Sequence, residues 1–301
     1  MPKQILITGA SGLVGSRLTQ LLIEQGHRVS HLSRSKKKGS IPTFVWNVKE
    51  KYIDPQAFNN VDTIIHLAGA GVADKRWNGK TKKEIKESRT HSTQLLCEKL
   101  KDHQHEVKTF VCASAIGYYG FTLSNELFTE ESKPGDDFLA QVVKAWEVEA
   151  DQISSIGIRV AKIRTGIVLS KNDGALKQIA LPVKLFVGSP LASGRQYMSW
   201  IHIDDLCGIF IKAVNDDKMN GAYNGVAPHS VTNKEMTGEI AKVLKRPLWA
   251  PNVPAFVLKL VVGEMADIVI NGSNVSSAKI ESAGYQFQFP SLDKAFNEIL
   301  C

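Results

Sequence analysis

The sequence of residues 5–15 is Ile5-Leu-Ile-Thr-Gly9-Ala-Ser-Gly12-Leu-Val-Gly15, an apolar run followed by three glycines at three-residue spacing. The apolar run predicts a strand and the residues after Gly12 predict a helix, an order typical of dinucleotide-binding folds. Gly9 permits the tight turn, Gly12 lets a pyrophosphate approach the helix N-terminus, and Gly15 lets helix and strand pack closely. A glycine-rich turn without a ligand is the alternative, which the flanking strand and helix make weaker.

Short β-rich runs alternate with longer amphipathic stretches through the first half of the chain. This alternation predicts βαβ units, and therefore an α/β fold with a Rossmann-type, doubly wound parallel sheet. The first helix is expected from Gly12 to Gln25, where Gly26 ends it. Strands are predicted at Gln4–Ile7, Arg28–Leu32, Thr63–Leu67, Thr109–Ala113 and Gly157–Ile163.

The alternation of strand and helix patterns ends after Ser170, where helical patterns are separated by Pro/Gly turns. We therefore expect a Rossmann domain over residues 1–170 and a smaller, mainly helical substrate region over residues 171–301. Two short strand patterns, Trp200–Ile203 and Ala222–Gly225, are candidates to return to the main sheet. The expected helices are Ala175–Phe186, Ile203–Val214, Asn233–Leu244 and Pro254–Ile268.

The composition is that of an ordinary globular protein, with 301 residues, 43% hydrophobic and 22% charged content. A net charge of +7 suits small anions as well as polyanions, and no motif supports a nucleic-acid partner. The stretch Ala255–Ile270 is apolar but interrupted by charges, which argues against a membrane span. The cysteines are far apart in the sequence, so we expect neither a metal site nor a disulfide framework. A cytoplasmic location is expected instead.

The end of the second predicted strand carries no acidic residue. An Asp or Glu there usually holds the ribose 2′-hydroxyl of NAD. Ser33 and Arg34 instead offer a hydroxyl and a guanidinium suited to a 2′-phosphate. The sequence therefore predicts NADP(H) as cofactor, with a solvated loop as the alternative for Arg34 and for Lys36–Lys38.

Downstream motifs resemble those of the extended short-chain dehydrogenase/reductases, and more narrowly the atypical "epimerase family protein" group with an uncharacterised C-terminal domain. The similarity covers nearly the whole chain. Its more specific stretches are Lys75-Arg-Trp77, Ser114-Ala-Ile-Gly-Tyr-Tyr-Gly120 and Trp200-Ile-His-Ile-Asp-Asp205.

The resemblance implies that Ser33 and Arg34 hold the 2′-phosphate and that Leu67 and Ala68 line the adenosine side. It also implies contacts from Glu84, Arg89 and Val168. From the helical spacing alone, Arg89 faces inward and needs a partner, which is a phosphate, Glu84 or a carbonyl. The expected cofactor-binding residues are Gly9, Ser11, Gly12, Leu13, Val14, Gly15, Ser33, Arg34, Leu67, Ala68, Gly69, Glu84, Arg89 and Val168.

The Tyr-x-x-x-Lys pair that such dehydrogenases use for proton transfer is missing, because Ala140 stands four residues before Lys144. The remaining catalytic candidates are Ser114, Tyr118 and Tyr119, which follow a strand at the edge where open α/β sheets place ligands. The alternative is that both tyrosines are packing aromatics with satisfied hydroxyls.

A second polar cluster, His202, Asp204 and Asp205, opens a predicted helix and is interpreted as capping rather than catalysis.

Two functions follow as hypotheses. The first is an NADP(H)-dependent oxidoreductase or epimerase that acts on a small-molecule substrate, a polar carbonyl or sugar-like compound. The second is a non-catalytic NADP(H)-sensing protein, motivated by the missing Tyr-x-x-x-Lys pair. The wider superfamily also suggests a homodimer, although the sequence identifies no interface.

Overall fold

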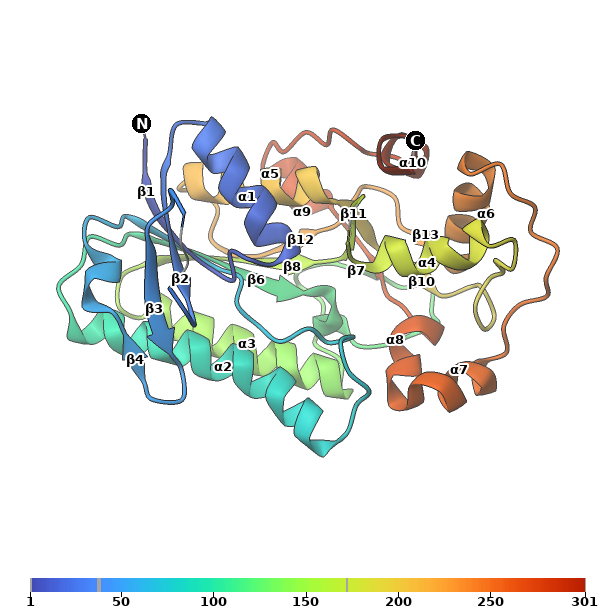
Figure 1. Ribbon diagram of the computed structural model, residues 1–301, viewed down its shortest axis with the longest axis horizontal. Helices are drawn as coiled ribbons and strands as arrows, with labels where there is room; N and C mark the ends of the chain where they lie inside the picture. The colour runs from blue at the N-terminus through green and yellow to red at the C-terminus, as the bar shows by residue number, and fades with distance from the viewer. Residues whose placement is uncertain (1, 37–38, 172, 301) are drawn as a thin grey trace.

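The computed structural model describes residues 2–36, 39–171 and 173–300 and confirms the expected α/β architecture. Within these residues the main sheet has eight strands in the order β12-β8-β6-β5-β1-β2-β3-β4 (Figure 1). Neighbouring strands are parallel except β3 and β4. The strands are β1 Gln4–Thr8, β2 Arg28–Ser33, β3 Thr43–Asn47, β4 Tyr52–Ile53, β5 Thr63–His66, β6 Thr109–Ala115, β8 Arg159–Thr165 and β12 Gly221–Gly225.

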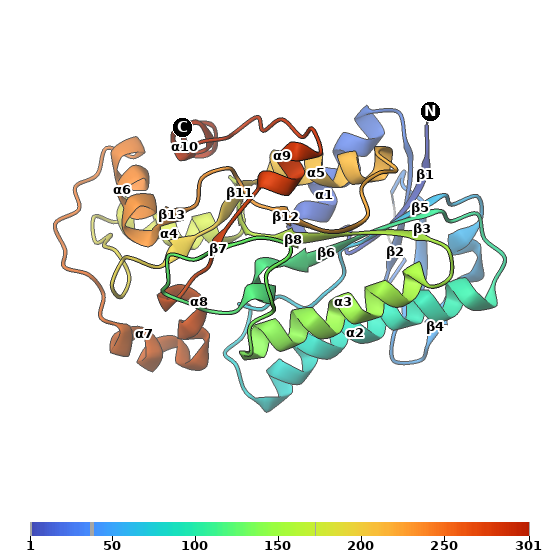
Figure 2. The same ribbon diagram turned by 180° about the vertical axis from the view of Figure 1, so that it is seen from behind.

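Helices cover both faces of this sheet (Figures 1 and 2). One face carries α1 (Leu13–Glu24) and α5 (Ile203–Asn215), and the other carries α2 (Gly79–Asp102) and α3 (Phe138–Ser154). Each pair buries an apolar stripe against the strands, which is why the first half of the chain alternates strand and helix patterns. The arrangement is the doubly wound sheet that the sequence predicts.

The C-terminal region divides into two groups of helices beside the sheet. In the first, α4 (Ala175–Lys184), α6 (Asn233–Val243) and α10 (Leu292–Leu300) share one core. In the second, α7 (Ala255–Val262) and α8 (Ala266–Ile270) approach the start of α2. The smaller elements are η1 Pro55–Phe58, η2 Ile116–Tyr119, η3 Gly263–Met265, α9 Ala278–Ser282, β7 Leu127–Phe128, β9 Ile167–Leu169, β10 Tyr197–Met198, β11 Trp200–His202, β13 Val231–Thr232 and β14 Asn274–Val275.

Two expectations for this region need correction. The helix predicted over Pro254–Ile268 is broken at Gly263, whose φ of +66° is outside the helical region. Of the two short strands expected to return to the main sheet, β12 does so beside β8, whereas β11 pairs with β9 outside it. Sequence patterns indicate a strand but not its partner, so this difference was not predictable locally.

A buried carboxylate ties the C-terminal segment to the sheet. Asp205, at the start of α5, is fully buried and accepts hydrogen bonds from the Tyr285 hydroxyl (3.0 Å) and from the backbone N–H groups of Gln288 (2.8 Å) and Phe289 (2.9 Å). Its neighbour Asp204 instead forms a partly exposed bidentate pair with Arg17 (2.6 and 3.1 Å). The side chain that caps α5 is that of His202; both aspartates lie in the first turn of the helix, but Asp204 pairs with Arg17 and Asp205 anchors the C-terminal segment.

Asp205→Ala is expected to lower the free energy of unfolding by about 3 kcal/mol, because it leaves several buried donors without an acceptor. Asp204→Ala removes only a partly exposed ion pair and should cost about 1 kcal/mol or less. Urea unfolding of both variants measures the difference. Equal losses would contradict the anchoring role of Asp205.

Candidate functional site

The glycine turn between β1 and α1 leaves an open helix N-terminus. Gly9 has a φ of +68°, and the Gly12 N–H donates to the Gly9 carbonyl at 3.0 Å. A Cβ on Gly9 would lie 2.8 Å from the Leu67 backbone, and one on Gly15 would lie 2.4 Å from the Gly9 oxygen. A Cβ on Gly12 would meet only the Gly9 oxygen, at 3.4 Å. Packing therefore requires Gly9 and Gly15, whereas Gly12 leaves space in front of α1 for an anion.

A buried polar network fixes the loop that faces this turn. Thr8 Oγ1 accepts from the N–H groups of Leu67 (3.1 Å) and Ala68 (3.2 Å), which leaves its hydrogen for His66 Nδ1 at 2.7 Å. The other His66 nitrogen lies 3.2 Å from Ser92 Oγ. Burial lowers the pKa of His66 to about 3, so the ring is neutral. Sequence reasoning missed this network, although two polar residues ending adjacent apolar strands were a signal.

The end of β2 presents Ser33 and Arg34 at the edge of the sheet. Ser33 is half-buried, and Arg34 is exposed, as are Ser11 in the glycine turn and Lys36. Arg34 makes no hydrogen bond or ion pair within the described part of the chain. Lys37 and Lys38 lie outside the described residues. An exposed guanidinium without an acidic neighbour fits a phosphate.

Arg89 of α2 is half-buried and packs against a backbone carbonyl and an aromatic ring. Its Nη1 donates to the Ile85 carbonyl at 2.9 Å, and its guanidinium lies 5.3 Å from the centre of the Trp146 ring. No described residue forms an ion pair with it, and burial lowers its pKa to about 10. Glu84, one of the partners that the spacing allowed, lies on the exposed side, 3.6 Å from Lys75. Of the partners expected for Arg89, only the carbonyl is therefore present, and no described carboxylate compensates the positive charge of Arg89.

The other segments expected to contact cofactor converge near the turn. A Cβ on Gly69 would lie 3.2 Å from the Arg89 side chain, so the loop after β5 rests on that guanidinium. A Cβ on Gly174, just before α4, would lie 3.2 Å from the Leu13 side chain and 3.5 Å from the Val168 carbonyl. Val14, Leu67 and Val168 pack on the same apolar cluster. Segments far apart in the sequence thus meet at the glycine turn.

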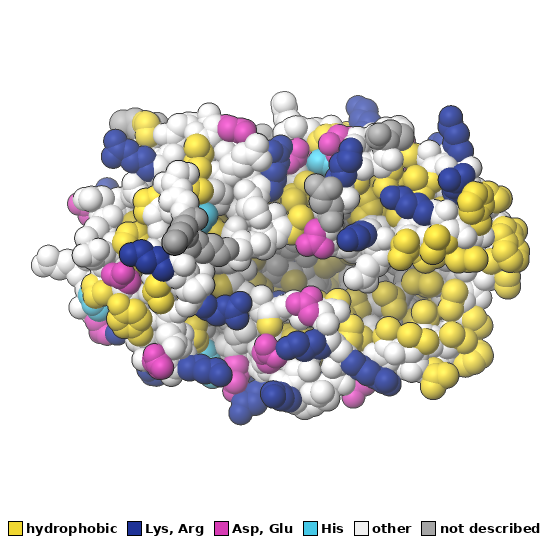
Figure 3. All heavy atoms as spheres, viewed as in Figure 1, with side chains coloured by type: hydrophobic (Ala, Val, Ile, Leu, Met, Phe, Trp, Pro, Cys, Tyr) yellow, Lys and Arg dark blue, Asp and Glu magenta, His cyan; other side chains and the backbone are white. Residues whose placement is uncertain are grey.

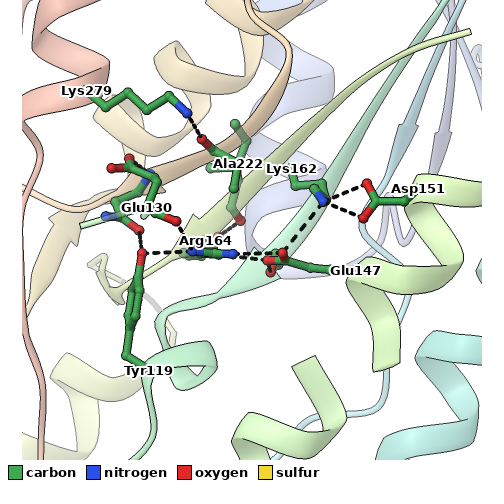
Figure 4. A network of polar contacts seen from close by, with 12 residues as sticks. Tyr119, Glu130, Glu147, Asp151, Lys162, Arg164, Ala222 and Lys279 are labelled. Carbon is green, nitrogen blue, oxygen red and sulfur yellow. Dashed lines mark hydrogen bonds and ion pairs between the residues drawn. The ribbon is translucent and has the colours of Figure 1, made fainter. Parts of the chain in front are cut away.

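A buried ion pair organises the carboxyl end of β6 and β8 (Figure 4). Glu147 accepts from Arg164 Nε (2.8 Å) and Nη2 (2.9 Å), and Ser114 Oγ donates to the same carboxylate at 2.6 Å. Lys162 Nζ lies 3.7 Å away. Burial by itself raises the pKa of Glu147, but the hydrogen bonds and charge of Arg164, with help from Ser114 and Lys162, outweigh it and hold the pKa below its ordinary value. The Ser114 hydroxyl is therefore committed to Glu147.

The two tyrosines of η2 differ in what their hydroxyls contact. Tyr119 donates to Asn224 Oδ1 at 2.6 Å and accepts from Arg164 Nη1 at 3.0 Å, and burial raises its pKa to about 12. Tyr118 is half-buried, with its ring face 3.5 Å from the guanidinium carbon of Arg164. Its hydroxyl makes no hydrogen bond within the described residues. Of the three catalytic candidates, Tyr118 alone has a hydroxyl that forms no hydrogen bond with a described residue.

Lys144 and His202, which the sequence offered as further candidates for catalysis, occupy positions typical of structural residues. On α3, Ala140 is fully buried and Lys144 is exposed, so this helix offers no tyrosine–lysine pair. His202 precedes α5, where its Nδ1 accepts from the Asp204 N–H at 3.1 Å. The described residues contain no cluster of three or more metal-ligating side chains. Their helices include none long and apolar enough to cross a membrane.

Comparison with known proteins places this geometry in a family. Residues 5–224 match the model of the NAD dependent epimerase/dehydratase family. The chain belongs to that family. Residues 253–299 match a further model, a domain of unknown function (DUF1731). The resemblance inferred from the sequence motifs is thereby confirmed.

Relatives of this family member match along almost its whole length. The chloroplastic homolog of epimerase family protein SDR39U1 from Arabidopsis thaliana is 35% identical over 98% of this chain and 86% of its own length. Epimerase family protein YfhF from Bacillus subtilis (strain 168) is 34% identical over 98% of this chain and 97% of its own.

Two solved structures of such relatives share the fold. Human epimerase family protein SDR39U1 (isoform2), crystallised with NADPH, matches with a TM-score of 0.87 and 33% identity over 98% of both chains. A nucleoside-diphosphate sugar epimerase from Corynebacterium glutamicum matches with a TM-score of 0.81 and 32% identity over 100% of this chain and 58% of that one.

Gly15→Ala is expected to lower the free energy of unfolding by about 3 kcal/mol, because the new Cβ meets the backbone. Gly12→Ala should cost less than about 1 kcal/mol and yet weaken NADPH binding at least about tenfold, because its Cβ fills the space in front of α1. Urea unfolding and NADPH titration measure the two effects. Full NADPH affinity in Gly12→Ala would contradict the assignment of this space to the cofactor.

Proposed function

We propose that the chain binds NADP(H) at the glycine turn and acts as an oxidoreductase or epimerase of the short-chain dehydrogenase/reductase superfamily. The observation that carries the proposal is the half-buried guanidinium of Arg89, which lies against Gly69 without a carboxylate partner among the described residues. A charge that is partly removed from water is costly until an anion compensates it. The exposed Arg34 and the NADPH in the human relative's crystal structure support the same cofactor.

The proposed contacts follow the order of the segments around the turn. Gly12 and the α1 N-terminus would receive the pyrophosphate, and Ser33 and Arg34 the 2′-phosphate. The adenosine would lie along Leu67 and Ala68, whose backbone Thr8 fixes. Arg89 would neutralise a phosphate, and Glu84 and Val168 would complete the site.

In the proposed reduction, bound NADPH supplies a hydride to a substrate carbonyl carbon and leaves as NADP⁺. Tyr118 would donate the proton that the carbonyl oxygen takes up, since its hydroxyl has no other partner among the described residues. Arg164 and Glu147 would be positioning residues that hold the Tyr118 ring. Ser114 would contact the oxygen only if Glu147 released its hydroxyl. A polar carbonyl or sugar-like substrate and a homodimer remain expectations from the sequence.

A second candidate function is an NADP(H)-sensing protein without turnover. It is favoured by the commitment of two expected catalytic hydroxyls, those of Ser114 and Tyr119, to Glu147 and Asn224. Ala140 in place of the usual tyrosine supports it as well. Turnover measurements separate the two functions.

Calorimetric titration tests the cofactor. NADPH is expected to bind at least about tenfold more tightly than NADH, and Arg34→Ala should remove that preference without changing the NADH affinity, because the guanidinium contacts only the extra phosphate. Lys36→Ala, a nearby exposed cation, is the matched control and should keep most of the preference. Equal affinities for the two cofactors in the wild type would overturn the assignment of NADP(H).

Cofactor oxidation across a panel of carbonyl compounds and nucleotide sugars tests the chemistry. Tyr118→Phe should lower turnover at least about a hundredfold while the NADPH affinity stays unchanged, because it removes only the proton donor. Tyr119→Phe is the control, since its hydroxyl is committed elsewhere, and it should keep turnover. Unchanged turnover in Tyr118→Phe would refute its role, and NADPH binding without any turnover would favour the sensing protein.

A further inference from the structure

Large hydrophobic side chains are exposed together on one face of the C-terminal region. Figure 3 shows this face hollowed between α4 and the α7–α8 pair, with hydrophobic side chains on both sides of the hollow. Phe256 and Leu260 of α7 are 72% and 78% exposed, and Trp249 is 70% exposed. Surfaces of this kind usually mark a binding site. The apolar groove consists of Leu181, Leu185, Phe186, Val187, Trp249, Phe256, Leu260 and Val261.

The first wall of the apolar groove starts beside the proposed cofactor site, and the second is fixed near the start of α2. The first wall is α4, which begins beside Leu13 at Gly174 and, at 1.5 Å a residue, places Leu185 about 15 Å away. The second wall, α7 with α8, is fastened to the segment that follows the Leu67–Gly69 loop. There Lys82 pairs with Glu264, and Ile268 joins the apolar cluster of Trp77.

A buried amide, that of Gln196, joins the segments that carry the two walls. Gln196 Nε2 donates to the Leu191 carbonyl (3.0 Å), in the loop after α4, and to the Val269 carbonyl (2.8 Å), in α8. Trp249 Nε1 donates to the Phe186 carbonyl at 2.8 Å, which fixes the outer end of the first wall. Hydrogen bonds therefore fix the two walls relative to each other, so the exposed side chains belong to one ordered surface.

We propose that the substrate of the proposed oxidoreductase carries a long apolar chain, which lies in the apolar groove while its carbonyl or alcohol carbon reaches the cofactor. This inference rests on the proposed function and replaces the polar, sugar-like substrate that the sequence suggested. The groove is concave, and its first wall begins at Gly174 beside Leu13 of the proposed cofactor site, which suits a chain attached to a reacting group better than a flat surface does. A sugar would need polar groups where these walls offer Leu, Phe and Val.

Tryptophan fluorescence tests the groove directly, because the four other tryptophans are buried and Trp249 lies in the first wall. The probes are straight-chain alcohols from hexanol to dodecanol, titrated into the full-length protein with NADPH present. The Trp249 emission should shift to shorter wavelength, and Kd should fall about fourfold for each added methylene until the groove is filled. Trp249→Phe should abolish the emission shift.

Two exposed positions make a matched pair of variants. Leu260→Gln, in the groove, should raise the Kd for dodecanol at least about tenfold, because it places a polar group against the chain. Val148→Gln is the control, since Val148 is 51% exposed on α3, outside the groove. The NADPH affinity should be the same in both variants and in the wild type.

Several results would overturn the inference. Alcohol binding that is independent of chain length, alongside normal NADPH binding, would refute it and leave the proposed function intact. A wild-type dimer that Leu260→Gln converts to monomers would assign the groove to a second copy of the chain. Binding to phosphatidylserine vesicles without binding of free alcohols would assign it to a membrane surface. Alcohol binding that depends on chain length, in a protein that does not bind NADPH, would instead overturn the proposed function. It would also overturn the inference that the apolar ligand is a substrate.

Discussion

The buried pair of Glu147 and Arg164 is the interaction on which the carboxyl end of the sheet depends. It joins α3 to β8, takes the Ser114 hydroxyl of β6, and reaches Tyr118 and Tyr119 of η2 through the guanidinium. Such a pair compensates its own desolvation only when the geometry is bidentate and the remaining polar atoms have partners, as here. Around this one ion pair, the hydroxyls of Ser114 and Tyr119 have protein partners, whereas that of Tyr118 has none among the described residues.

The half-buried Arg89 shows the opposite situation. Arg164 has a full set of partners, whereas Arg89 has one carbonyl and an aromatic ring and no carboxylate among the described residues. Burial lowers the pKa of Arg89 to about 10, which still leaves the guanidinium charged at neutral pH, and a bound phosphate would compensate that charge. The contrast between the two arginines is why we place the proposed cofactor at the glycine turn and the proposed proton donor at Tyr118.

Local patterns predicted the centre of the fold, and the cofactor-binding residues that they indicate stay a prediction. The five predicted strands lie within two residues of β1, β2, β5, β6 and β8, because buried strands and amphipathic helices repeat over short distances. Strands β3 and β4, at one side of the sheet, were missed, since four of the five β3 residues are only half-buried and β4 has just two residues. The partner of Ser114 stands 33 residues away, and no local spacing indicates such a contact. The break at Gly263 was missed because a glycine inside an apolar run does not by itself end a helix.

The most direct test of the account is thermal unfolding of Arg89→Met with and without NADPH. Methionine keeps the contact with Trp146 and removes the uncompensated charge. The account predicts that the variant without cofactor unfolds at the wild-type temperature or above it, and that the rise in unfolding temperature caused by NADPH is lost. A variant that is clearly less stable without cofactor and yet shows the full rise with NADPH would contradict the account, because Arg89 would then serve the fold and not the ligand.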